Sequence, residues 1–168
     1  MALFFCLAHA EVVIEFVINV ANDIQAREVD LNTTQLNPEA VATGKFRDDR
    51  LLINISSSIA SKEQAAHVWG FVEGYMTRDL INSTYTDVVE SFGLSNYTLL
   101  NLTTAARRFR RTGEDTLLHC FLDGMVQATA IEYEKLYILN MYNELYTLVS
   151  QTGYVPGREL LVRNFGVV

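Results

Sequence analysis

Cysteine, proline and long apolar runs are all scarce in this sequence. Its 168 residues include two cysteines and two prolines, so neither a disulfide framework nor a proline-rich segment is expected. The most apolar stretch, Val12–Val20, contains Glu15 and Asn19. It therefore falls short of the roughly 18 apolar residues that a membrane-spanning helix needs, and no transmembrane anchor is expected.

Positive charge is also scarce, with 13 Lys and Arg against 20 Asp and Glu and a formal net charge of −7. Nucleic acid is therefore not expected as a partner, because phosphate binding needs a cationic surface. The three histidines, His9, His67 and His119, are far apart and have no evident acidic partner in the sequence. No metal site and no cofactor are predicted. Apolar residues make up 49%, which is enough for a buried core.

The first ten residues resemble a short signal peptide. Met1–Ala10 has a small apolar core and ends in Ala8-His9-Ala10, the pattern that precedes signal-peptidase cleavage. It lacks a basic beginning and is shorter than the usual roughly 15–30 residues. A truncated or unusually short signal peptide is one interpretation, and a buried N-terminal strand is the other. Residues 11–168 are interpreted as a single, partial domain.

Sequons for N-glycosylation support export through the secretory pathway. Chance would give about one or two Asn-x-Ser/Thr sequences in a chain of this composition, whereas five occur. Some could instead serve as helix caps or turns, which also favour Asn and Thr. Asn54, inside a predicted strand, is the weakest acceptor. The predicted glycosylation sites are Asn32, Asn54, Asn82, Asn96 and Asn101.

The first third of the chain is predicted to form strands, because β-branched residues are frequent and turn residues separate the runs. Arg47–Arg50 is a polar, hairpin-like connection, and residues 30–39 are predicted to be a loop. The predicted strands are Val12–Val20, Ala40–Phe46 and Leu51–Ser56.

The rest is predicted to form helices. Ser61-Lys-Glu-Gln64 is a capping box that begins the first helix. Further helices are predicted over 96–110 and from about residue 114, and the strongest periodicity lies in 138–149. Strands followed by helices favour an α+β fold. The apolar face predicted for the first helix consists of Ala65, Val68, Trp69, Val72, Tyr75 and Met76.

Gly70 and Gly74 lie one turn apart inside the first predicted helix and together form a groove. Each glycine costs roughly 1 kcal/mol relative to alanine in a helix, which indicates a packing reason. One interpretation is that the groove packs against a catalytic sheet with Glu73 buried beside it. The favoured one is close helix packing with Glu73 in solvent.

His119 and Cys120 do not form a base and nucleophile pair, because adjacent helical residues point in different directions. Cys120 is predicted to be buried and inert. No Gly-x-Ser-x-Gly sequence offers a serine nucleophile. Asp123 could be a buried acid that orients backbone N–H groups or a solvated residue. The cluster Arg107–Arg111 could contact anionic lipid or be a processing site. The favoured interpretation is that its positive charges complement the dipole at the C-terminus of a helix.

Several segments together resemble the phospholipase B-like family over roughly residues 38–150. Gln64–Thr77 resembles its helix of the form Q-x-x-A-A/V-G-F-L-E-G-Y-L-T, and Pro38–Asp48 resembles its A-V-A-x-G-x-F-x-D strand. Asp123-Gly124 and the stretch to Leu148 resemble its Q-x-D-G-L helix and the segment after it.

The resemblance implies a four-layer αββα N-terminal-nucleophile hydrolase, with a few antiparallel strands followed by a helical block in this portion. Family members are secreted or lysosomal glycoproteins, and a cysteine freed by internal cleavage attacks an acyl ester or amide bond, with phospholipid the nominal substrate. The family's Gly-His-Cys-Ser is absent here, and so is a Gly-Trp-Gly element in the hairpin region Arg47–Asn54. No catalytic residue is therefore assigned.

Two functions are expected from these observations. The first is the N-terminal portion of a phospholipase B-like hydrolase, inactive alone and in contact with acyl substrate only when the missing portion is present. The second is a secreted, non-enzymatic helical module that binds a partner, or a second copy, through an exposed apolar face at 138–149.

Overall fold

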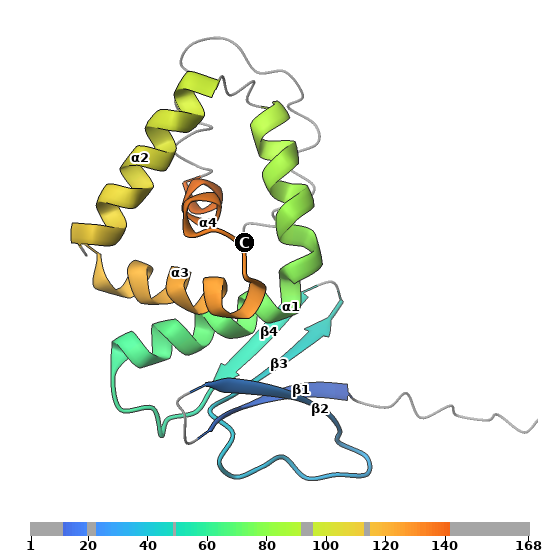
Figure 1. The fold of residues 1–168 in the computed structure, drawn as a ribbon. Helices are drawn as coiled ribbons and strands as arrows, with labels where there is room; N and C mark the ends of the chain where they lie inside the picture. Colours follow the sequence, from blue (N-terminus) through green and yellow to red (C-terminus); the bar gives the residue numbers. More distant parts are fainter. Residues whose placement is uncertain (1–11, 20–22, 49, 92–95, 113–114, 142–168) are drawn as a thin grey trace, which may run out of the picture.

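A computed structural model describes residues 12–19, 23–48, 50–91, 96–112 and 115–141 (Figure 1). These residues form one antiparallel sheet of four strands followed by four helices, which confirms the predicted α+β class and order of elements. The predicted signal peptide and most of the 138–149 face lie outside the described residues. The elements are β1 (Val12–Ile18), β2 (Ile24–Asp30), β3 (Ala42–Arg47), β4 (Arg50–Ile55), α1 (Lys62–Ser91), α2 (Asn96–Thr112), α3 (Thr116–Thr129) and α4 (Tyr133–Asn140).

The strands lie in the order β2-β1-β3-β4, each antiparallel to its neighbour. β3 and β4 form the predicted hairpin, whose last pair is Arg47 with Arg50. Asp48 has a φ of 50°, as expected at the tip of a tight hairpin. β2 was not predicted, because polar side chains interrupt its alternation. It is held in place by pairing with β1 and by the burial of Ile24 and Val29.

One face of the sheet is covered by the first half of α1 (Figure 1). Phe16 of β1, Val68 and Val72 of α1 are fully buried between them. Gly44 of β3 allows this approach, because a Cβ there would lie 3.1 Å from Cγ1 of Val72. The Phe16 ring also meets the Tyr75 ring edge to face at 5.6 Å. This interface is the first of two hydrophobic cores.

The capping box at the start of α1 is confirmed in its first half, since the backbone N–H of Gln64 donates to Ser61 Oγ at 3.0 Å. The predicted apolar face is wrong at Trp69 and Tyr75, which are 51% and 45% exposed. Phe71 is buried instead. The buried side of α1 differs from the predicted apolar face because the helix packs on both the sheet and α3.

The second core joins α3 and α4 to the second half of α1 and to α2, and α4 lies among these three helices (Figure 1). α3 begins after Asp115, whose side chain accepts a hydrogen bond from the N–H of Leu118 at 3.0 Å. Ala130, with a φ of 57°, ends it and turns the chain into α4. Tyr133 and Ile138 of α4 are buried. Ile138, at the start of the predicted 138–149 face, is therefore not available to a partner.

Candidate functional site

Gly70, Gly74 and Gly124 form a seam where α1 and α3 cross with their backbones in contact. A Cβ at Gly70 would overlap the carbonyl oxygen of Phe121, and a Cβ at Gly124 would overlap that of His67. The glycines of each helix thus leave the space that the backbone of the other helix occupies. The structure confirms the close helix packing of the favoured interpretation, but Glu73, which that interpretation placed in solvent, is half-buried. The alternative is wrong on one point, because the groove packs against α3 and not against the sheet.

Glu73, beside this seam, is half-buried and hydrogen-bonded within its own helix. Trp69 Nε1 donates to its Oε2 at 3.1 Å. Burial raises the pKa of Glu73 above its ordinary value of 4.5, and the hydrogen bond from Trp69 offsets part of that increase.

Replacing Glu73 with glutamine is expected to raise the melting temperature at pH 7 and to leave it unchanged near pH 4. Below pH 4.5 the carboxyl is protonated in both the folded and the unfolded chain. As pH rises through 4.5 and then through the higher folded pKa, ionisation favours the unfolded chain, so wild-type stability falls. Glutamine removes this loss and can still accept from Trp69. Thermal melts of both proteins at the two pH values test this, and an equal difference at both would contradict it.

His119, Asp123, Tyr133 and Arg110 form a closed network that joins α2, α3 and α4. His119 Nδ1 lies 3.3 Å from the Tyr133 hydroxyl, and its Nε2 lies 3.3 Å from Asp123 Oδ2. Arg110 lies 3.5 Å from Asp123 Oδ1 and stacks over the Tyr133 ring at 4.8 Å. The expectation that no histidine has an acidic partner is wrong, because residues four apart share one face of a helix.

The role of this network is to hold the three helices together. Burial, followed by the charge of Asp123, raises the pKa of Tyr133 to about 12, so its phenol keeps its proton and can donate to His119. Both nitrogens of His119 are then engaged, and neither serves the neighbouring Cys120. Cys120 is half-buried, less than predicted. Burial and the charges of Asp123 and Glu63 raise the pKa of its thiol, which disfavours the nucleophilic thiolate.

The arginine cluster at the end of α2 divides between two roles. Arg110 reaches α3, and Arg107 reaches α4, where its Nε donates to Glu134 at 3.0 Å. Arg108 and Arg111 are exposed in the last turns of the helix. The cluster therefore ties neighbouring helices together, in addition to complementing the helix terminus as predicted.

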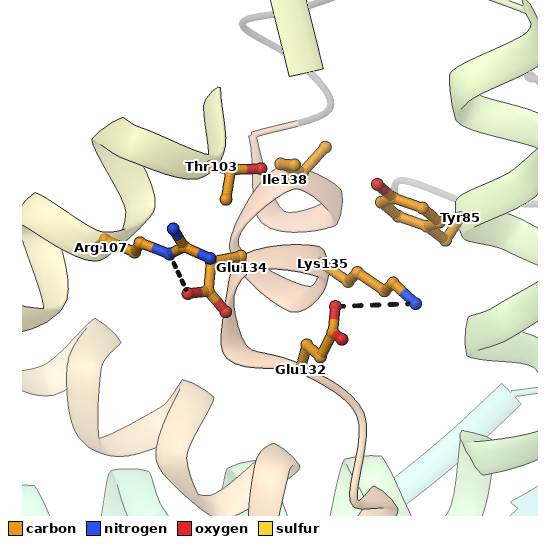
Figure 2. A pocket seen from close by; sticks show the side chains of 7 residues that line it. All are labelled: Tyr85, Thr103, Arg107, Glu132, Glu134, Lys135 and Ile138. Carbon is orange, nitrogen blue, oxygen red and sulfur yellow. Dashed lines mark hydrogen bonds and ion pairs between the residues drawn. The ribbon is translucent and has the colours of Figure 1, made fainter. Parts of the chain in front are cut away.

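A cleft of about 250 Å³ lies between α1, α2 and α4, and Figure 2 shows the side chains that line it. Its charged groups are paired with one another: Arg107 with Glu134, and Lys135 with Glu132 at 3.8 Å. The Lys135 ammonium also lies 5.6 Å from the centre of the Tyr85 ring. No nucleophile and base meet among its lining residues. The lining consists of Tyr85, Thr103, Arg107, Glu132, Glu134, Lys135 and Ile138.

The second surface feature is the sheet face opposite α1, which has an ion pair to a buried carboxylate and a shallow depression. Glu15 is buried there at 1% exposure, bonded to Arg27 at 2.7 Å and to the backbone N–H of Asn37 at 2.9 Å. The loop 31–41 is thereby tied over part of the face. A shallow depression of about 280 Å³ remains beside it. Three leucines that line it stay exposed by 37–42%: Leu31, Leu36 and Leu52.

Three of the predicted glycosylation sites have described side chains, and all three are exposed: Asn32, Asn54 and Asn82. Asn32 lies in the turn after β2, where its backbone N–H donates to Asp30. Asn54 lies on β4, in the depression just described. Asn96 and Asn101 belong to α2, and their side chains lie outside the described part of the chain.

Among the described residues, no group of His, Cys, Asp and Glu is placed to hold a metal ion. Within the same residues, no helix combines the length and apolar character needed to cross a bilayer. A scan against models of protein families matches none of them, and no curated protein matches the sequence.

Proposed function

We propose that this chain is the N-terminal portion of a phospholipase B-like hydrolase, a secreted or lysosomal glycoprotein that cleaves acyl ester or amide bonds of lipids. The chain supplies a sheet and a helical layer, and a separate portion supplies the nucleophilic cysteine. Alone it is inactive, because Gly-His-Cys-Ser is absent from its sequence. The observation that carries the proposal is the one-sided sheet.

This sheet has a helical layer on one face and exposed leucines on the other. α1, which contains the family-like segment Gln64–Thr77, covers the first face. On the second, Leu52 of β4 and two leucines of the loop 31–41, Leu31 and Leu36, are exposed around the 280 Å³ depression. Half of an αββα arrangement has this form, because the second sheet would pack on the face that no helix covers. In such an assembly Asn54 would be covered, so we expect glycans on Asn32 and Asn82 but not on Asn54.

The test is to co-express the chain in a secretory host with a phospholipase B-like portion that begins with cysteine. We expect a complex that releases fatty acid from phospholipid, and loss of hydrolysis when that cysteine is replaced by alanine. Leu31→Asp combined with Leu36→Asp is expected to prevent the complex, since both leucines are exposed on the loop that covers part of this face. Absence of complex and hydrolysis, with the chain folded, would contradict the proposal.

A further inference from the structure

The outer edge of β4 is open along its length in the described part of the chain. β4 pairs with β3 from Arg50 to Ile55. In a hairpin closed by two residues the last pair is hydrogen-bonded, and such pairs then alternate along the strands. The bond from Ser56 N–H to the Val41 carbonyl, 2.8 Å, continues that alternation. The backbone groups of Leu51, Ile53 and Ile55 therefore point away from β3.

This edge also lacks the features that usually protect sheet edges, namely proline, bulges and charged side chains. Its pairing with β3 is regular, and the sequence from Leu51 to Ile55 contains no proline and no charge. The opposite edge, β2, provides a contrast within the same sheet. It presents Gln25, Arg27, Glu28 and Asp30.

An exposed tryptophan lies on the same side of the molecule. Met76 of α1 faces β3, with its Cγ 3.4 Å from where a Cβ of Gly44 would be. Trp69 lies two turns before Met76 and so shares its side of the helix, away from β1. Trp69 is 51% exposed, and its ring is held by the hydrogen bond to Glu73. Exposed aromatic rings of this kind are frequent in protein interfaces.

The edge is complementary to itself. Two antiparallel copies of β4 centred on Ile53 would place Leu51 opposite Ile55, so the side that faces α1 is apolar throughout. On the other side Leu52 would lie opposite Asn54, and Arg50 opposite Ser56, so no like charges would meet. The outward backbone groups of each copy would then bond to those of the other.

We propose that the β4 edge is a self-association surface, at which two copies of this chain join their sheets across a two-fold axis through Ile53. Such an axis brings the same patch of both copies together, which is the commonest arrangement of homodimers. This self-association needs only this chain and does not depend on the hydrolase proposal.

Sedimentation equilibrium over a range of concentrations tests it, with protein made in a host that adds no N-glycans. The wild type is expected to reach the mass of a dimer. Leu52→Lys with Asn54→Lys would place lysines opposite each other and should weaken dimerisation about tenfold or more, which corresponds to about 1.4 kcal/mol. Leu52→Lys with Asn54→Glu would instead place opposite charges together and should restore the dimer.

Leu36→Lys is the matched control, because this leucine is 40% exposed on the same face but lies outside β4, while Leu52 is 42% exposed. It should leave the dimer intact. The proposal is overturned if the wild type stays monomeric, if the double-lysine variant still dimerises, if the charge-matched variant does not recover, or if Leu36→Lys has the same effect as the double-lysine variant. Circular dichroism verifies that each variant is folded.

Discussion

Replacing Gly124 with alanine is expected to destabilise the protein by about 3 kcal/mol, the upper end for overpacking a well-packed interior. The new Cβ would overlap the backbone carbonyl of His67, and a carbonyl in the middle of a helix cannot move aside as a flexible side chain can. Alanine's better helix propensity recovers only about 1 kcal/mol. The melting temperature should fall by roughly 10 °C in a chain of this size.

Gly74→Ala is the matched control in the same seam. Its Cβ would lie 3.1 Å from Met125 Cα and 3.2 Å from a methyl group of Thr129, tight contacts but not overlaps. Here the gain in helix propensity offsets most of the strain, so the net change should be within about 1 kcal/mol. Urea unfolding of both variants makes the comparison. Equal stability of the two would show that the helices can separate without cost, contrary to the packing described.

Replacing Arg27 with alanine is expected to cost about 2 kcal/mol, between the values for exposed and for buried ion pairs. Glu15 is buried, and the variant would leave its carboxylate with the single hydrogen bond from Asn37. The cost is below the buried limit because Arg27 itself is 60% exposed. The loop 31–41 should loosen with it, which hydrogen exchange at Asn37 would detect.

A double-mutant cycle separates the charge from the packing. Glu15→Gln keeps an oxygen that can accept from Asn37 and removes the charge. In that background Arg27→Ala should cost much less than in the wild type, because no buried carboxylate is left unpaired. A similar cost in both backgrounds would mean that Arg27 acts through the packing of its aliphatic part.

The glycine seam indicates that the family-like segment Gln64–Thr77 has a packing role. Gly70 and Gly74 are its most distinctive residues, and their contacts are with α3 rather than with a catalytic sheet. Val68 and Val72, on another side of the same helix, contact the sheet. The segment thus contributes to both hydrophobic cores. The residues that carry its resemblance to the family are in packing contacts and not in a catalytic site.

Local patterns predicted much of the fold. The β3–β4 hairpin, the Ser61 cap and the α2 start at Asn96 follow from turn residues, capping groups and apolar periodicity. These signals depend on neighbours within a few residues, so the sequence contains them in full. The pair Gly70 and Gly74 likewise indicated close packing, since glycine inside a helix is costly unless a backbone approaches it.

Contacts between distant segments decided the rest. β2 forms because β1 pairs with it, although its own sequence is polar. Trp69 is exposed and Phe71 is buried because α1 packs against both α3 and the sheet. Tyr133 completes the His119 network across 14 residues, and Asn37 reaches Glu15 across 22. Side chains that touch only after the chain has folded leave no local periodic signal. The sequence by itself therefore determined every described element except β2, and only the tertiary structure decided β2 and the partners of the others.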